Sequence, residues 1–184
     1  MKNANVFALL LIFLSMSACQ TYSPQRYIPA TDTAVVLKTY PKVRARVEPF
    51  VLSSAFDAAC RGAGDFTPPV NMTVQGYIQQ AFSDELKLAD LYDEMSPDVV
   101  LSGVIDALSF SSAKGLTGGE WNIGIKLSSS NGASMYATEN YLFESAFGGD
   151  TACKRAAEAF LPATQKLILQ VVRSESFRSL LRRK

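Results

Sequence analysis

Stretches in which apolar residues alternate with polar ones, or gather in β-rich runs, predict the strands of this chain. The stretches predicted as strands are residues 34–37, 43–47, 99–110, 121–128 and 134–147. Pro49 confines the predicted strand at residues 43–47 to the edge or end of a sheet. Gly103 and Asp106 interrupt the long third run and indicate a β-bulge. Asn131-Gly132 predicts a tight hairpin turn between the last two strands.

Two stretches instead repeat apolar residues three and four positions apart, which predicts amphipathic helices. The first begins after Thr73, a good N-cap residue, and ends before Pro97. The second begins at Asp150 or Thr151, and its apolar stripe extends as far as residue 181. Pro162 lies inside it and predicts a kink or a division there.

With the two short stretches before the first helix counted as one β unit, the order β-α-β-β-β-α predicts the α+β class, specifically a two-layer sandwich. An antiparallel sheet of about four strands would carry both helices on one face, because each helix has a single apolar stripe. Residues 34–184 would form one domain, which the length of the chain allows. Residues 53–69, rich in glycine and proline, are predicted as a long loop.

The start of the chain has the layout of a secretory signal peptide. Lys2 precedes an unbroken apolar run at residues 6–14, and small residues lead to Cys19. A nine-residue helix is about 14 Å long, whereas a bilayer core is about 30 Å thick. Residues 1–18 are therefore predicted as a signal peptide rather than a membrane span. In an ordinary secreted protein, cleavage would fall near Ala18 and Cys19 would have no special role.

The sequence Met16-Ser17-Ala18-Cys19 resembles the lipobox of bacterial lipoproteins. The resemblance implies cleavage before Cys19 and attachment of fatty acyl chains to that residue, which together give stable membrane anchoring. The residue after the cysteine is Gln20 and not an aspartate. By the same resemblance, this implies the outer membrane, with the domain in the periplasm. The polar, proline-containing residues that follow predict a flexible tether over residues 19–33, with a reach of roughly 20 Å.

Composition excludes several kinds of chemistry. The chain has no histidine, so neither a Ser-His-Asp nor a Cys-His pair can be built. Two cysteines besides Cys19 are too few for a cysteine-only zinc site. The formal net charge of +1 provides no field that would attract nucleic acid. We therefore expect no enzymatic activity, no metal or other cofactor, and no nucleic-acid partner.

The two remaining cysteines, Cys60 and Cys153, are predicted to form a disulfide, since an exported domain meets oxidising conditions. The bond would close a loop of about 93 residues, for which chain entropy gives roughly 4–5 kcal/mol of stabilisation. The alternative is a pair of separately buried thiols.

Residues of the glycine-rich loop at 111–120 and aromatic residues of the strands after it are candidates for a partner surface. The candidates are Lys114, Leu116, Trp121, Tyr136 and Tyr141. Aromatic residues on strands more often belong to the core, so that interpretation stays open. Acidic residues between 84 and 94 are interpreted as a solvated helix face. The basic residues 178–184 suit a helix C-terminus, with contact to anionic headgroups as an alternative.

The anchor, the tether and the β-α-β-β-β-α order resemble small envelope lipoproteins of the lipopolysaccharide-assembly and transport-auxiliary types. The segments CRGAGD, DELKLADLYD, LSSSNG and DTACKRAAEAFLPA are similar to proteobacterial lipoproteins of unknown function. The resemblance implies a non-enzymatic accessory protein that binds another envelope protein. Two alternatives stay open: a protein that binds a lipid, glycan or small ligand, and a hydrolase that uses two carboxylates.

Overall fold

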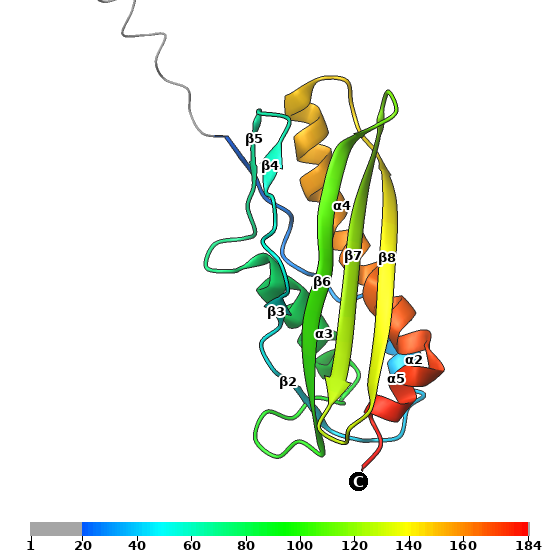
Figure 1. The fold of residues 1–184 in the computed structure, drawn as a ribbon. Coiled ribbons are helices and arrows are strands. Elements are labelled where there is room, and N and C mark those ends of the chain that lie inside the picture. The colour runs from blue at the N-terminus through cyan, green and yellow to red at the C-terminus, as the bar shows by residue number, and fades with distance from the viewer. Residues whose placement is uncertain (1–19, 184) are drawn as a thin grey trace, which may run out of the picture.

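The computed structural model describes residues 20–183, which form two sheets and four helices around a single hydrophobic core (Figure 1). The strands are β1 (Thr21–Tyr22), β2 (Ala45–Val47), β3 (Val51–Leu52), β4 (Ala59–Cys60), β5 (Gly64–Phe66), β6 (Val99–Lys114), β7 (Gly118–Ser129) and β8 (Ser134–Glu144). The helices are α2 (Thr31–Leu37), α3 (Val74–Leu88), α4 (Gly149–Arg173) and α5 (Glu175–Leu180). The α+β class is confirmed.

The main sheet is mixed, with five strands, and so differs from the predicted antiparallel sheet of about four. β6, β7 and β8 form the antiparallel part, whereas β2 and β3 both pair parallel to β6. The chain leaves β3 and returns to β6 only after α3, and such a crossover allows parallel pairing. β2 and β3 make short pairings, and Pro49 separates them.

A second, small sheet was not predicted. It has the order β1-β5-β4. β4 and β5 lie within the predicted loop at residues 53–69 (Figure 1), whereas β1 comes from the predicted tether. β1 pairs parallel to β5, and β4 pairs antiparallel to it. Its strands are two or three residues long. Strands this short are marginal by themselves, so packing against the rest of the domain must hold them in place.

The predicted strand at residues 34–37 is wrong, because these residues end helix α2. Thr33, Ala34 and Leu37 are buried on one side of that helix. Their spacing of one to four residues fits a helical face. A four-residue apolar run is compatible with a strand or a helix, and only the flanking residues and the core decide between them.

The predicted flexible tether is also wrong over its described part, residues 20–33. Tyr22 is buried in β1, and Tyr27 packs edge-on against Tyr77 of α3 at 6.2 Å between ring centroids. The Tyr77 hydroxyl donates a hydrogen bond to the carbonyl of Gln25 at 2.9 Å. The segment is therefore part of the folded domain.

Helices α3 and α4 cover one face of the main sheet, as predicted (Figure 1). The Thr73 side chain caps α3 by accepting a hydrogen bond from the Gly76 amide at 3.1 Å. α4 continues through Pro162 without dividing, and the break comes later, at Ser174. The predicted signal peptide and Cys19 lie outside the described residues. Within residues 20–183, no helix is long and apolar enough to cross a bilayer.

Candidate functional site

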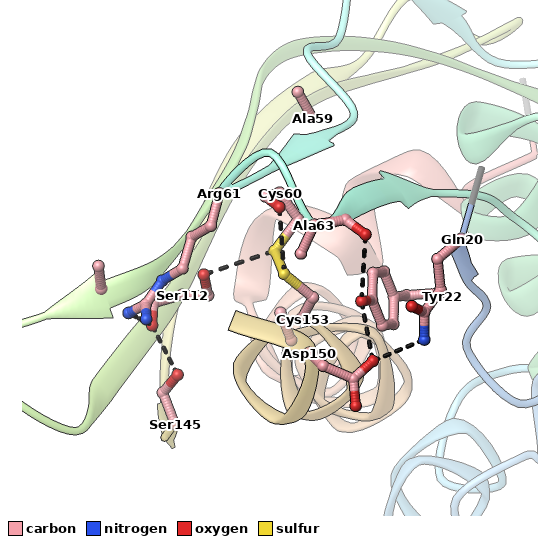
Figure 2. Close-up of a disulfide and its surroundings, with 12 residues drawn as sticks. Gln20, Tyr22, Ala59, Cys60, Arg61, Ala63, Ser112, Ser145, Asp150 and Cys153 are labelled. Carbon is pink, nitrogen blue, oxygen red and sulfur yellow. Dashed lines mark hydrogen bonds between the residues drawn. A yellow bond between two sulfur atoms is a disulfide. The ribbon is translucent and has the colours of Figure 1, made fainter. Parts of the chain in front are cut away.

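The predicted disulfide is confirmed: Cys60 at the end of β4 is bonded to Cys153 in α4 (Figure 2). The two Cα atoms are 5.9 Å apart, and 93 positions separate the residues in the sequence. Both residues are buried. The bond therefore joins the small sheet covalently to the first turns of α4.

Hydrogen bonds around this disulfide fix the beginning of the described chain. Gln20 Nε2 and the Tyr22 hydroxyl both donate to Asp150 Oδ1, at 2.6 and 3.0 Å (Figure 2). Asp150 lies in the first turn of α4, where a carboxylate is favoured by the helix dipole. Cys19 directly precedes Gln20, so a lipid on Cys19 would attach the domain at this end.

Arg61 connects the neighbouring loops at the same end. Its guanidinium donates to the carbonyl of Ser112 at 2.5 Å (Figure 2). It also donates to the carbonyls of Ala146 and Phe147, at 3.3 and 3.2 Å. The turn after β4, the end of β6 and the segment between β8 and α4 are thereby held together. Sequence reasoning did not single out Arg61, because its three acceptors are main-chain carbonyls far along the chain.

The structure does not bring the five predicted partner-surface residues together. Trp121 is 0 % exposed and belongs to the core, so its assignment to a surface is wrong. Tyr141 is half-buried, with Lys166 Nζ 5.6 Å from its ring centroid. Lys114 and Leu116 lie at the tip between β6 and β7, where Lys114 pairs with Glu120 and Leu116 is 84 % exposed.

Tyr136 is the fifth of these residues and lies on the solvent-exposed face of the main sheet. Its hydroxyl donates to Asp106 Oδ1 at 3.1 Å. The ring reaches across Gly124, where an added Cβ would lie 2.6 Å from the hydroxyl. Asp106 is the residue of the predicted bulge, which is confirmed by the register shift between Ile105 and Ala107. Tyr136 is therefore held in place by three adjacent strands.

Strand β8 offers a more coherent candidate site, because among residues 20–183 it pairs with β7 alone. The Ser129 amide donates to Ala133 O at 2.9 Å, and the Ser145 amide donates to Thr117 O at 2.6 Å. Hydrogen-bonded pairs recur at every second residue of an antiparallel ladder. The even-numbered residues from Ser134 to Glu144 therefore direct their backbone N–H and C=O groups to the free edge.

A groove of about 310 Å³ accompanies this edge, between β8 and α4. Its lining residues are Glu139, Lys166, Leu169, Gln170 and Arg173. Glu139 is only 8 % exposed, and burial raises the pKa of its carboxyl, while Lys166 opposes that rise. An extended peptide could pair with the β8 edge and contact both the apolar and the charged residues of α4 here. The alternation at residues 134–144 predicted the strand, but only the fold shows that it is an edge.

Glu85 departs from the predicted solvated acidic face, since it is 1 % exposed. Its Oε1 accepts hydrogen bonds from the Tyr27 hydroxyl at 2.5 Å and the Ala30 amide at 2.7 Å. Burial raises the pKa of Glu85, and these two donors oppose the rise. Because Glu85 is sealed from solvent and bound to the N-terminal segment, its geometry suits holding that segment on α3.

Replacing Glu85 by glutamine is expected to reduce the pH dependence of stability. A raised pKa means that the folded state binds this proton more tightly than the unfolded chain, whose value is 4.5. The contribution of Glu85 to stability is then greatest at low pH and falls as pH rises from 4.5 towards the folded-state pKa of Glu85. Urea unfolding of both proteins from pH 4 to 8 tests this. Glu144→Gln, at an exposed position, is the control and should keep the wild-type change of stability with pH. The same change with pH in Glu85→Gln as in the wild type would contradict a raised pKa for Glu85.

Comparison with known proteins shows similarity in fold alone. No family model and no curated protein matches the sequence. A protein of Xanthomonas campestris described by the family model DUF330 aligns with a TM-score of 0.51 and 12 % identity, over 83 % of this chain and 95 % of its own. A candidate lipoprotein of Caulobacter crescentus aligns with a TM-score of 0.45 and 13 % identity, over 81 % of this chain and 95 % of its own. PelC of Paraburkholderia phytofirmans, solved as a dodecamer, aligns with a TM-score of 0.40 and 15 % identity, over 78 % of this chain and 95 % of its own. The mixed α+β fold of residues 20–183 therefore resembles that of the DUF330 protein.

Proposed function

We propose that this chain is a lipid-anchored envelope lipoprotein that acts as a non-enzymatic accessory subunit. In this proposal Cys19 carries the acyl chains, and the folded domain lies in the periplasm at the outer membrane. The resemblance of residues 16–19 to a lipobox and the disulfide between Cys60 and Cys153 support export. The absence of histidine from the sequence argues against the commonest acid–base and nucleophilic mechanisms.

The partner of this accessory protein would be an envelope protein that adds an extended segment to β8. Among residues 20–183, no strand pairs with the second edge of that eleven-residue strand, and this observation carries the proposal. Unpaired backbone groups along an edge form a template for another strand. The groove beside α4 would receive every second side chain of the added segment, which gives selectivity as well as affinity.

The anchor is tested by replacing Cys19 with serine. The wild-type protein should fractionate with the outer membrane and carry fatty acid. Cys19→Ser should give an uncut precursor or a product in the soluble fraction, because a serine hydroxyl cannot accept the thioether-linked lipid. Wild-type protein of mature size without attached lipid would contradict the anchor while leaving the strand-edge site untouched.

The strand-edge site is tested with two substitutions at Thr138, whose amide points to the free edge. Thr138→Pro removes that donor without removing a hydrogen bond to β7, whereas Thr138→Val keeps the donor and the size of the side chain. A photocrosslinking residue in place of the exposed Leu142 should join to an envelope protein in the Thr138→Val background. The same adduct should be at least tenfold weaker with Thr138→Pro. Equal adducts in the two backgrounds would contradict strand addition at β8.

A further inference from the structure

A second groove is lined by residues 41–43, which precede β2, and by residues between 178 and 183. Figure 1 places β2 and the C-terminus at the end of the main sheet away from β4 and β5. It has a volume of about 460 Å³. Its apolar lining comes from Pro41 and Val43, which precede β2, and from Leu181, the C-cap residue of α5. Volumes of this size are typical of sites for small ligands.

All four charged residues that line this groove are basic: Lys42, Arg178, Arg182 and Arg183. Arg183 is paired with Asp98, its Nε lying 3.0 Å from Oδ1. The other three form no ion pair with any carboxylate of residues 20–183. An anion entering the groove would therefore meet three basic side chains that pair with no carboxylate of residues 20–183.

The elements around the groove are held in a fixed arrangement. Asn131 in the β7–β8 turn donates from Nδ2 to the carbonyls of Ser179 at 2.9 Å and Arg182 at 2.8 Å, which ties the end of α5 to the sheet. The Arg178 guanidinium lies over the Tyr40 ring, 5.4 Å from its centroid. Asp98 binds both the Arg44 amide, at 2.8 Å, and Arg183. The groove is therefore formed before any ligand arrives.

We propose that this groove binds an anionic amphiphile, that is, a phosphate or carboxylate group attached to a hydrocarbon segment. The hydrocarbon would contact Pro41, Val43 and Leu181, and the anion would lie between Lys42, Arg178 and Arg182. Guanidinium groups suit both phosphate and carboxylate, because they donate two parallel hydrogen bonds. Such a ligand could come from a phosphate-bearing lipid or from a free fatty acid. The site is separate from the β8 edge and does not depend on lipidation of Cys19.

The test uses the soluble product of the Cys19→Ser chain, purified without detergent, and octyl phosphate below its micelle-forming concentration. NMR shifts of the Val43 and Leu181 methyl groups report occupancy of the groove. Octyl phosphate should bind at least tenfold more tightly than octyl glucoside or inorganic phosphate. Hexyl phosphate should bind more weakly, by up to roughly fourfold for each buried methylene that it lacks. Octanoate tests the carboxylate source: tighter binding than octyl phosphate points to fatty acids, and weaker binding points to phosphate-bearing lipids.

Two charge variants complete the test. Lys42→Gln/Arg182→Gln removes two of the three basic groups that pair with no carboxylate of residues 20–183. Both side chains are exposed, and the change should weaken octyl phosphate binding at least tenfold. Lys126→Gln/Lys154→Gln changes the net charge equally at exposed positions elsewhere and should leave binding within twofold. Unchanged methyl shifts with octyl phosphate would overturn the proposal. So would equal binding of octyl glucoside, or an equal loss in the two double variants.

Discussion

Replacing both Cys60 and Cys153 by alanine is expected to lower the free energy of unfolding by about 4–5 kcal/mol. The disulfide closes a loop of 93 positions, and chain entropy makes so long a loop costly to close without a covalent link. For a domain of this size the change corresponds to a fall in Tm of roughly 8–20 °C. Thermal unfolding of the double variant against the oxidised wild type measures it.

The loss should begin in the small sheet, whose strands have two or three residues each. Hydrogen exchange should speed up first in residues 59–66 and only later in β6 and β7. Reduced wild-type protein is the matched control, since it keeps both sulfur atoms and loses only the bond. Equal Tm values for oxidised and reduced wild type would show that the bond contributes little.

The elements predicted best from sequence are those whose signals are local. The Asn131-Gly132 turn follows the strongest alternating strand, and the turn residues themselves set its geometry. Thr73 caps α3 through a hydrogen bond to a residue three positions away. The bulge at Asp106 interrupts a long β-rich run. In each case the residues that determine the structure are neighbours in the sequence.

The errors concern segments whose partners lie far along the chain. Residues 20–33 look like a linker by composition, yet Gln20 and Tyr22 bind Asp150, and Tyr27 binds Glu85. Nothing local identifies those partners. The parallel pairing of β2 with β6 likewise depends on the crossover through α3, and only three residue pairs form it.

The candidate sites show the same division between local and tertiary information. Alternation at residues 134–144 predicts which side chains share a face, but a strand becomes an edge only through the order of the sheet. The basic groove brings residues 41–43 next to residues 178–183, and the helical spacing of the last segment does not reveal that neighbour. The residue types therefore indicate which positions are charged or apolar. They do not indicate which of these positions lie together on one surface.

Replacing Trp121 by alanine is expected to lower the free energy of unfolding by about 3–5 kcal/mol, the range for large aromatic residues removed from a core. Its ring contacts Phe110 at 4.8 Å and Phe160 at 4.6 Å between centroids, and its Nε1 donates to the carbonyl of Ala156 at 2.8 Å. The substitution would therefore open a cavity between β7 and α4 and remove the indole hydrogen bond to a buried helix carbonyl.

Tyr136→Ala is the matched control, because Tyr136 is also an aromatic residue of the hairpin but is 54 % exposed. Its loss removes one exposed hydrogen bond to Asp106 and should cost no more than about 1 kcal/mol. Urea unfolding followed by circular dichroism compares the two, since the chain has only one tryptophan and the first variant lacks it. Similar losses of unfolding free energy for the two variants would contradict the assignment of Trp121 to the core and support a surface position for it. A difference of several kcal/mol would leave the exposed residues of β8, and not the indole, as the part of the hairpin able to meet a partner.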